Sequence, residues 1–509
     1  MAMNEERPTF PIQPGRGLGF ISLGASLHGV LSRLKSQPQV FPRIDVTYSP
    51  TEPLSEPVVL TLSGNGIRLR FDGPDQRLRL IEIIDFSQSI FTYKNAELVR
   101  QPTGTDTTHT EAVQGPSFKH LYNRLLGPSY AGEYIPPPSG DDDGTYVLSW
   151  PGIAARFYLK HRSWSEKADF VSLLSSSAAS PATSLAIFEG TSWPAIRNSL
   201  YSDRSRLARN PALNTKTTDA IPDEIEEVVV HERGRLELFR RTSPPLSVVL
   251  GETTPQDLVA DLGPPDAIFR KSNVGLSIHA GAASKPRRTS TSPSLDPYQY
   301  EHDENSNRSY TDDSEGEANH VVEGADGESS SDLFYNYFHH GFDIMISAPQ
   351  QKAGEDSASS DLVATKIFLH GNVPGSYSFK RHRRSRWRIV LDDNGHPLHL
   401  TSEMRFGEIS EILRDIYHET YASLEEEKQM TRGMVLNRGW GVGNSPESSI
   451  ELLGGFEEGM NTKEQISSTG GDASMSALNN TELFGFPGLL FEVLKNDHIS
   501  CLTVYKEAH

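Results

Sequence analysis

Hydrophobic positions recur in the same order four times along the chain. In each copy, a segment with apolar residues at helical spacing precedes a strand of the form Gly-apolar-x-apolar, and a second apolar strand follows. A repeated unit decides the architecture of a chain, so this pattern predicts an α+β fold. We expect tandem helix-plus-antiparallel-sheet modules packed into one elongated body, with long disordered insertions. The helix-like segments cover residues 23–34, 118–125, 250–262 and 409–416, and the glycine-led strands cover residues 66–71, 152–157, 341–346 and 488–493.

The repeats also set the expected domain boundaries. Residues 273–331 and 441–480 interrupt the third and fourth modules, and residues 273–331 are rich in Ser, Asp and Glu with few aliphatic side chains. Such a composition buries too little apolar surface to offset the entropy of ordering, so we predict both insertions to be disordered. The predicted modules are residues 17–95, residues 112–200, residues 225–272 with 332–400, and residues 401–440 with 481–507.

Two serines in the first insertion resemble kinase sites. Ser290 follows Arg287 and Arg288, and Ser314 precedes Glu315. The alternative is a solvated linker that carries no modification.

Charge and cysteine content narrow the classes of function. The 509 residues carry a formal net charge of -19, which disfavours nucleic acid as a partner because binding to a duplex requires a cationic surface. The single cysteine, Cys501, excludes an intramolecular disulfide, fits a reducing compartment and is expected to be buried in a strand. We find neither a signal peptide nor a transmembrane segment, so the sequence predicts a cytoplasmic protein that reaches membranes only peripherally.

The search for catalytic groups finds no convincing site. His339, His340 and Asp343 are the residue types of a metal or acid/base site. Adjacent residues of a strand point to opposite faces, however, so the two imidazoles are not expected to share an ion. No serine or cysteine has the context of a nucleophile elbow. The sequence therefore predicts no enzyme activity, no cofactor and no metal.

One short segment is strongly basic in an otherwise acidic chain. On a regular strand, most of its cations would share one face and form a ribbon. We predict that this ribbon binds anionic phospholipid headgroups, since each Lys or Arg near such a surface contributes roughly 1 kcal/mol. The alternatives are pairing with the chain's own acidic insertion, a nuclear-import-like basic run, and contact with the acidic surface of a protein partner. The candidate lipid-binding residues are Lys380, Arg381, His382, Arg383, Arg384, Arg386 and Arg388.

Residues spread over nearly the whole chain resemble the phagosome assembly factor family, an autophagy-related family. Among the matching positions are Gly66, Ile67, Asp72, Gln76, Arg77, Gly127, Pro128, Tyr130, Gly132, Tyr337, Gly341, Asp343, His370, Asn372, Gly375, Phe491, Asn496, His498 and Tyr505.

The resemblance implies a non-enzymatic adaptor in autophagosome formation. Members of the family pair with a β-propeller protein and associate with phosphoinositide-containing membrane, so this chain is expected to be cytoplasmic and recruited to the preautophagosomal structure. The alternative function is a Golgi or endosomal trafficking scaffold that acts only through protein contacts, without lipid binding.

Overall fold

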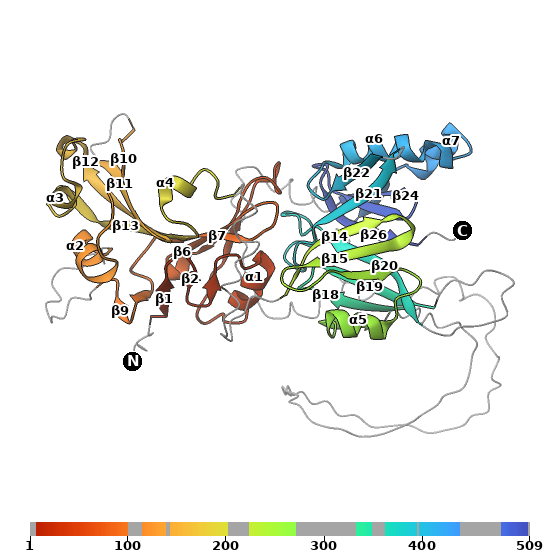
Figure 1. Cartoon of the computed structure of the whole chain (residues 1–509), viewed down its shortest axis with the longest axis horizontal. Coiled ribbons are helices and arrows are strands. Elements are labelled where there is room, and N and C mark those ends of the chain that lie inside the picture. Colours follow the sequence, from red (N-terminus) through yellow and green to blue (C-terminus); the bar gives the residue numbers. More distant parts are fainter. Residues whose placement is uncertain are drawn as a thin grey trace, which may run out of the picture. The chain divides into compact units, whose positions relative to one another are not determined.

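The chain folds into helices and mostly antiparallel strands, which confirms the α+β class (Figure 1). The structure is a computed structural model. It describes residues 7–99, 115–138, 143–201, 223–270, 332–348, 362–393, 396–437 and 480–506. The described residues up to Phe269 and from Asp332 onward belong to one compact unit. The two predicted insertions, with Ser290 and Ser314, lie outside the described residues, except for Asn480, which begins a strand.

The first half of the chain forms two sheets. The smaller sheet has the spatial order β3 (Ile21–Ser22), β2 (Gly17–Leu18), β1 (Thr9–Gln13), β8 (Ile90–Tyr93) and β9 (Ala96–Glu97). The larger sheet has the order β10 (Glu133–Ile135), β11 (Asp143–Trp150), β12 (Ile153–Lys160), β13 (Ala179–Phe188), β7 (Leu78–Ile83), β6 (Ile67–Phe71), β5 (Val58–Leu62) and β4 (Asp45–Thr47). The α-helices of this half are α1 (Leu27–Lys35), α2 (Phe118–His120), α3 (Phe170–Leu174) and α4 (Trp193–Ile196).

The second half forms two further sheets. The smaller one has the order β16 (Leu246–Val249), β15 (Arg235–Arg240), β14 (Ile225–His231), β21 (Trp387–Asp393) and β22 (His396–Thr401). The larger one has the order β17 (Ala267–Arg270), β18 (Leu333–Tyr337), β19 (Phe342–Ser347), β20 (Val363–His370), β26 (Ile499–Tyr505), β25 (Leu489–Val493), β24 (Asn480–Phe486) and β23 (Met434–Asn437). The α-helices of this half are α5 (Pro255–Leu262), α6 (Phe406–Tyr417) and α7 (Leu424–Met430).

The two halves repeat the same topology. In each, a three-stranded meander leads through a helix into a four-stranded meander, then into a hairpin, a helix and a second four-stranded meander. The last strands of the two four-stranded meanders pair with each other, β7 with β13 and β20 with β26. The first strand pairs in parallel with the hairpin, β1 with β8 and β14 with β21. Each large sheet thus joins strands of two predicted modules, and the module boundaries themselves stay a prediction.

Amphipathic elements build one large hydrophobic core in each half, beside two smaller clusters. Helix α1 buries Val30 and Leu34 on one face, and its N-cap Ser26 accepts a hydrogen bond from Gly29 N–H at 3.2 Å. Helix α6 buries Ile409 and Leu413 in the same way. The cores are separate clusters, one formed by residues of the first half and the other by residues of the second.

Candidate functional site

The basic segment lies in the connection between β20 and β21, which we call the connecting segment, residues 371–386. Strand β21 begins only at Trp387, so the prediction of a regular strand from Lys380 onward is wrong. Lys380 has a φ of 73°, which reverses the chain direction and ends any strand alternation. As a result three consecutive side chains, His382, Arg383 and Arg384, are all buried.

Arg384 is held by main-chain carbonyl groups from three parts of the chain. Its Nε donates to the carbonyl oxygen of Pro74 at 2.7 Å, and its other nitrogens donate to Gly371 at 2.6 Å and Ser402 at 3.3 Å. Glu403 lies 3.8 Å away and supplies a countercharge. A buried guanidinium is tolerated only with such a set of partners, so this cation is structural in the folded state.

Arg383 forms a buried ion cluster with two residues of other elements. The Glu224 carboxylate accepts a hydrogen bond from Arg77 and lies 3.5 Å from Arg383. Arg383 also donates to the carbonyl oxygen of Ile225. Burial alone would raise the pKa of the Glu224 carboxyl, but the charges of Arg383 and Arg77 outweigh it and lower the pKa to about 2. Glu224 therefore stays ionised and neutralises part of the cluster.

Arg386, just before β21, and Arg388, within β21, are half-buried and paired with carboxylates. Arg386 lies 2.8 Å from Glu403 and 3.0 Å from Asp75, and Arg388 lies 3.2 Å from Glu227. These three carboxylate contacts and those of Glu224 come from the folded body. The sequence also allowed the basic run to pair with the acidic insertion. That insertion lies outside the described residues, so this alternative stays a prediction.

Lys380 and Arg381 lie in the turn that precedes the buried residues. Both are half-buried, and the Lys380 ammonium is 5.8 Å from the ring centroid of Phe379. The neighbouring Tyr377 is 45% exposed. Of the seven candidate lipid-binding residues, these two are the nearest in sequence to this exposed aromatic residue.

The connecting segment also makes a reciprocal amide contact with the first half. The Asn372 side-chain amide donates to Gln76 Oε1 at 2.6 Å, and the Gln76 amide donates to the Asn372 carbonyl oxygen at 2.8 Å. Both residues are buried, with positive φ angles of 44° and 49°. Buried amides and strained backbone persist only where the surroundings hold them, so this contact fixes the start of the segment.

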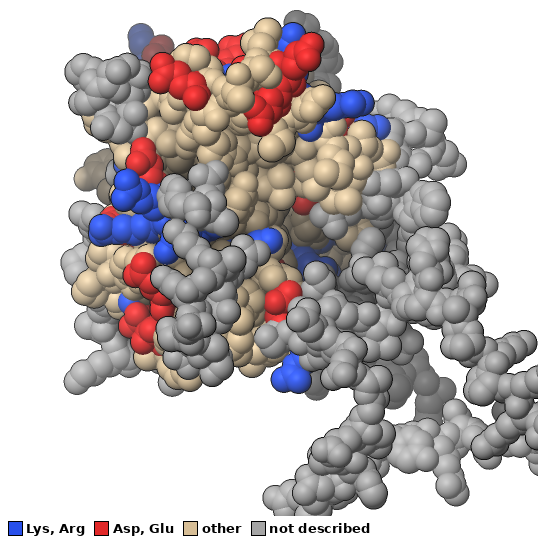
Figure 2. Space-filling model, turned by 90° about the vertical axis from the view of Figure 1, so that its right-hand side faces the viewer, with Lys and Arg blue, Asp and Glu red and all other residues tan. Residues whose placement is uncertain are grey.

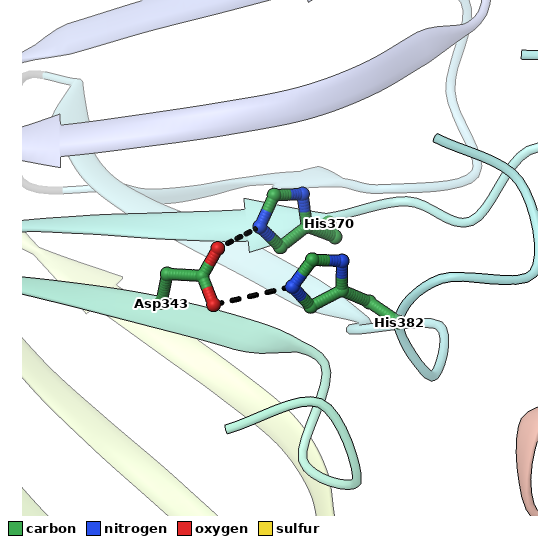
Figure 3. Close-up of side chains that lie close together, drawn as sticks. All are labelled: Asp343, His370 and His382. Carbon is green, nitrogen blue, oxygen red and sulfur yellow. Dashed lines mark hydrogen bonds and ion pairs between the residues drawn. The ribbon is translucent and has the colours of Figure 1, made fainter. Parts of the chain in front are cut away.

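One residue of the basic segment, His382, also belongs to a second site. Together with Asp343 and His370 it forms a histidine–aspartate cluster (Figure 3). Asp343 comes from β19, His370 from the end of β20, and His382 from the connecting segment. The two imidazole Nε2 atoms lie 2.8 Å and 3.1 Å from the two carboxylate oxygens of Asp343. The rings stack with their centroids 3.8 Å apart.

The two histidines of the cluster differ in their pKa values. Burial would lower the pKa of His370, but Cys501 and Asp343 raise it to about 10. Burial and the charge of His370 lower the pKa of His382 to about 4. The pKa of Asp343 lies well below its ordinary value, because its two histidine partners outweigh the effect of burial. At neutral pH the cluster therefore holds one carboxylate, one imidazolium and one neutral imidazole.

The histidines singled out from the sequence are arranged differently from the prediction. His339 and His340 lie in the turn after β18 and not on a strand, and their rings are 3.9 Å apart. They nevertheless have different partners: His339 Nδ1 lies 2.6 Å from Asp266, and His340 Nδ1 accepts from the Ile225 N–H at 3.4 Å. Asp343 contacts neither and faces His370 and His382.

Sequence reasoning missed this cluster because its members come from three separate segments. His382 was counted as a cation of a lipid-binding ribbon, and His370 only as a position of the family pattern. The signal that could have joined them is the antiparallel pairing of β19 with β20, which brings the start of one strand to the end of the other. Cys501 is buried in β26 opposite His370, which confirms the expected strand position.

The surface of the second half is acidic at one end. Figure 2 shows Asp and Glu gathered at the top, at the height where Figure 1 places α6 and α7. These helices contribute Glu408, Glu425, Glu426 and Glu427. None of the described helices is long and apolar enough to cross a membrane.

The described part of the chain is an α+β protein of two repeated halves, and the buried charges of its connecting segment pair within the chain. The family comparison gives this α+β protein a specific identity. The model of the family Phagosome assembly factor 1 (PHAF1) matches residues 17–300 and 319–505, and the chain belongs to this family. This confirms the resemblance seen in the sequence, and membership indicates a role in phagosome assembly.

Relatives from plants and animals match over most of their length. The PHAF1 protein At3g51130 of Arabidopsis thaliana is 22% identical over 507 residues, which cover 98% of this chain and 93% of the relative. The PHAF1 protein CG7083 of Drosophila melanogaster is 22% identical over 502 residues, covering 96% and 90%. The PHAF1 protein T01G9.2 of Caenorhabditis elegans is 23% identical over 405 residues, covering 76% and 78%. No solved structure matches the chain significantly.

Proposed function

We propose that the protein is a non-enzymatic scaffold in phagosome and autophagosome assembly that binds a β-propeller partner. The match of an assembly-factor family to nearly the whole chain is the observation that carries this proposal. The site geometry supports it, because the buried arginines of the connecting segment contact carbonyls and carboxylates of the protein itself. Their charges are thus engaged inside the folded chain.

The partner is tested by purification of the tagged full chain from cells under mild conditions. We expect a β-propeller protein to co-elute in a stoichiometric complex on gel filtration, identified by mass spectrometry. A chain that elutes alone, although folded by circular dichroism, would contradict a stable pairing.

Membrane association is the second part of the proposal, and it concerns the turn that holds Tyr377, Lys380 and Arg381. Aromatic side chains with a polar end and flanking cations favour the interface of an anionic membrane. His382, Arg383 and Arg384 are buried in the folded chain, so they reach headgroups only after the segment opens. The membrane-facing part of the predicted ribbon is therefore the turn, and the protein is expected in the cytoplasm with recruitment to the preautophagosomal structure.

Vesicle sedimentation tests this contact. The double variant Lys380→Gln/Arg381→Gln is expected to bind phosphatidylcholine vesicles containing phosphoinositide about thirtyfold more weakly, since two cations contribute about 2 kcal/mol. The matched control Lys119→Gln/Arg124→Gln removes two exposed cations near α2 and should bind as the wild type does. Wild-type protein that fails to bind these vesicles would favour the alternative, a trafficking scaffold that works through protein contacts alone.

A further inference from the structure

We propose that Asp343, His370 and His382 bind a divalent transition-metal ion, with Zn²⁺ as the ion that fits best. The site concerns the second half alone and does not depend on the proposed function. Its role would be structural: the ion would join β19, β20 and the connecting segment at one point.

The donor atoms already converge. One ligand atom from each of the three residues lies within 4.8 Å of the others, and the two imidazole Nε2 atoms lie 2.8 Å and 3.1 Å from different carboxylate oxygens of Asp343. Ligands at about 2.0–2.2 Å from a tetrahedral zinc ion are roughly 3.3–3.5 Å from each other. The ion would therefore be admitted once the side chains turn so that one carboxylate oxygen and both imidazole nitrogens reach this spacing.

The donor set selects the metal. Two imidazole nitrogens and one carboxylate oxygen suit Zn²⁺ and its transition-metal neighbours, whereas Mg²⁺ and Ca²⁺ prefer oxygen ligands only. Three protein ligands leave a fourth position for water or for a group from a partner.

The surroundings hold the donors in place. Asp343 is anchored opposite Phe368 in the pairing of β19 with β20, and His370 is the last residue of β20. The Phe338 ring packs against His382 with centroids 4.9 Å apart, and the Cys501 side chain neighbours the His370 imidazole. Packing of this kind fixes ring orientation and limits the access of water, as supporting residues do in metal sites.

His382 provides an independent reason to expect a ligand. The residue is only 3% exposed, and its Nδ1 atom has no hydrogen-bond partner among the described residues. An unsatisfied buried polar atom costs about 1–3 kcal/mol. A ligand at Nδ1 would remove that cost, whereas a metal bond at Nε2 would replace the hydrogen bond to Asp343 and leave Nδ1 unpaired.

Metal binding would stabilise more than the cluster. His382 directly precedes Arg383 and Arg384, and these two contact Ile225 and Pro74. An ion that fixes His382 therefore also fixes the part of the connecting segment that contacts the first half of the chain.

The test uses the full chain, freed of metal by a chelator and titrated with Zn²⁺ in a calorimeter. We expect one Zn²⁺ per chain and a rise in the melting temperature on binding. His382→Gln and Asp343→Asn should each weaken binding more than about hundredfold, since even residues that only hydrogen-bond to a ligand typically contribute on the order of 10–100-fold. The control His339→Gln removes a histidine from another His–Asp pair, with Asp266, and should leave binding unchanged.

If His382→Gln does not fold, a variant that replaces this metal-binding residue by another one still tests the proposal. Cysteine is itself a zinc ligand, so His382→Cys should retain binding, and its Co²⁺ complex should gain a thiolate-to-metal absorption band that the wild type lacks. Wild-type protein that takes up no Zn²⁺, equal uptake by wild type and His382→Gln, or a His382→Cys complex without that band would each overturn the proposal.

Discussion

The buried ions of the connecting segment depend on partners that are far away in the sequence. Arg384 contacts the carbonyl oxygen of Pro74, and Arg383 shares Glu224 with Arg77. An intact buried ion pair stabilises the fold little more than apolar side chains packed in its place would. Removal of one member, however, leaves a buried charge or carbonyl unsatisfied and lowers the stability. Single substitutions should therefore affect stability very differently along the basic run.

Arg384→Met is expected to lower the free energy of unfolding by about 3 kcal/mol, because three carbonyl groups lose their donor. Arg388→Met is the matched control, since it removes a half-buried ion pair with Glu227 and should cost less than about 1 kcal/mol. Urea unfolding of the two variants measures both values. Equal losses would show that Arg384 is not held as described.

Glu224 should make stability depend on pH in a defined window. Its folded pKa of about 2 is below its ordinary value of 4.5, so its contribution is fully present above about pH 4.5 and is lost as the pH falls toward 2. At pH 7, Glu224→Gln is expected to cost about 3 kcal/mol.

The stability gap between wild type and Glu224→Gln should shrink on acidification through this window, as measured by urea unfolding at several pH values. Glu237→Gln, which alters the half-exposed pairs with His231 and Arg235, should give a small gap at every pH. A gap for Glu224→Gln that stays constant from neutral to acidic pH would contradict the assigned ion cluster.

Helices and strands with clear periodicity could be predicted from the sequence. The apolar run of helical spacing in residues 23–34 predicted α1, and the glycine-led strand at Gly66 corresponds to β6, which Gly66 precedes with a φ of 70°. The shared cationic face assumed a regular strand through the basic run, yet Pro374 and Gly375 just before it are turn residues. Residues 380–384 are all basic and leave no apolar face to fix a strand, so tertiary contacts decided the backbone there.

At the level of the whole chain, the four repeats combine into two equivalent halves. The sequence could reveal the four copies, because each helix and meander has its own apolar pattern. It could not reveal that the last strands of two meanders pair to form one sheet, since pairing partners such as β7 and β13 are set by tertiary contacts.

The halves differ in one connection that the structure describes from end to end. Residues 84–89 join β7 to β8, whereas the longer segment 371–386 joins the equivalent strands β20 and β21. This extra length carries the buried arginines, the Asn372 amide and His382. The histidine–aspartate cluster could not be predicted for the same reason, because it depends on how this segment folds back onto β19.

The central claim is that the basic segment is an internal, buried connection of the folded chain. Hydrogen–deuterium exchange of the full chain tests it directly, because the amide of Arg383 donates to Phe338 and that of Ser385 donates to His370, each at 2.8 Å. We expect a peptide covering residues 382–386 to exchange as slowly as peptides from β20. Exchange at the rate of an unprotected chain would instead show an exposed cationic ribbon and contradict this account.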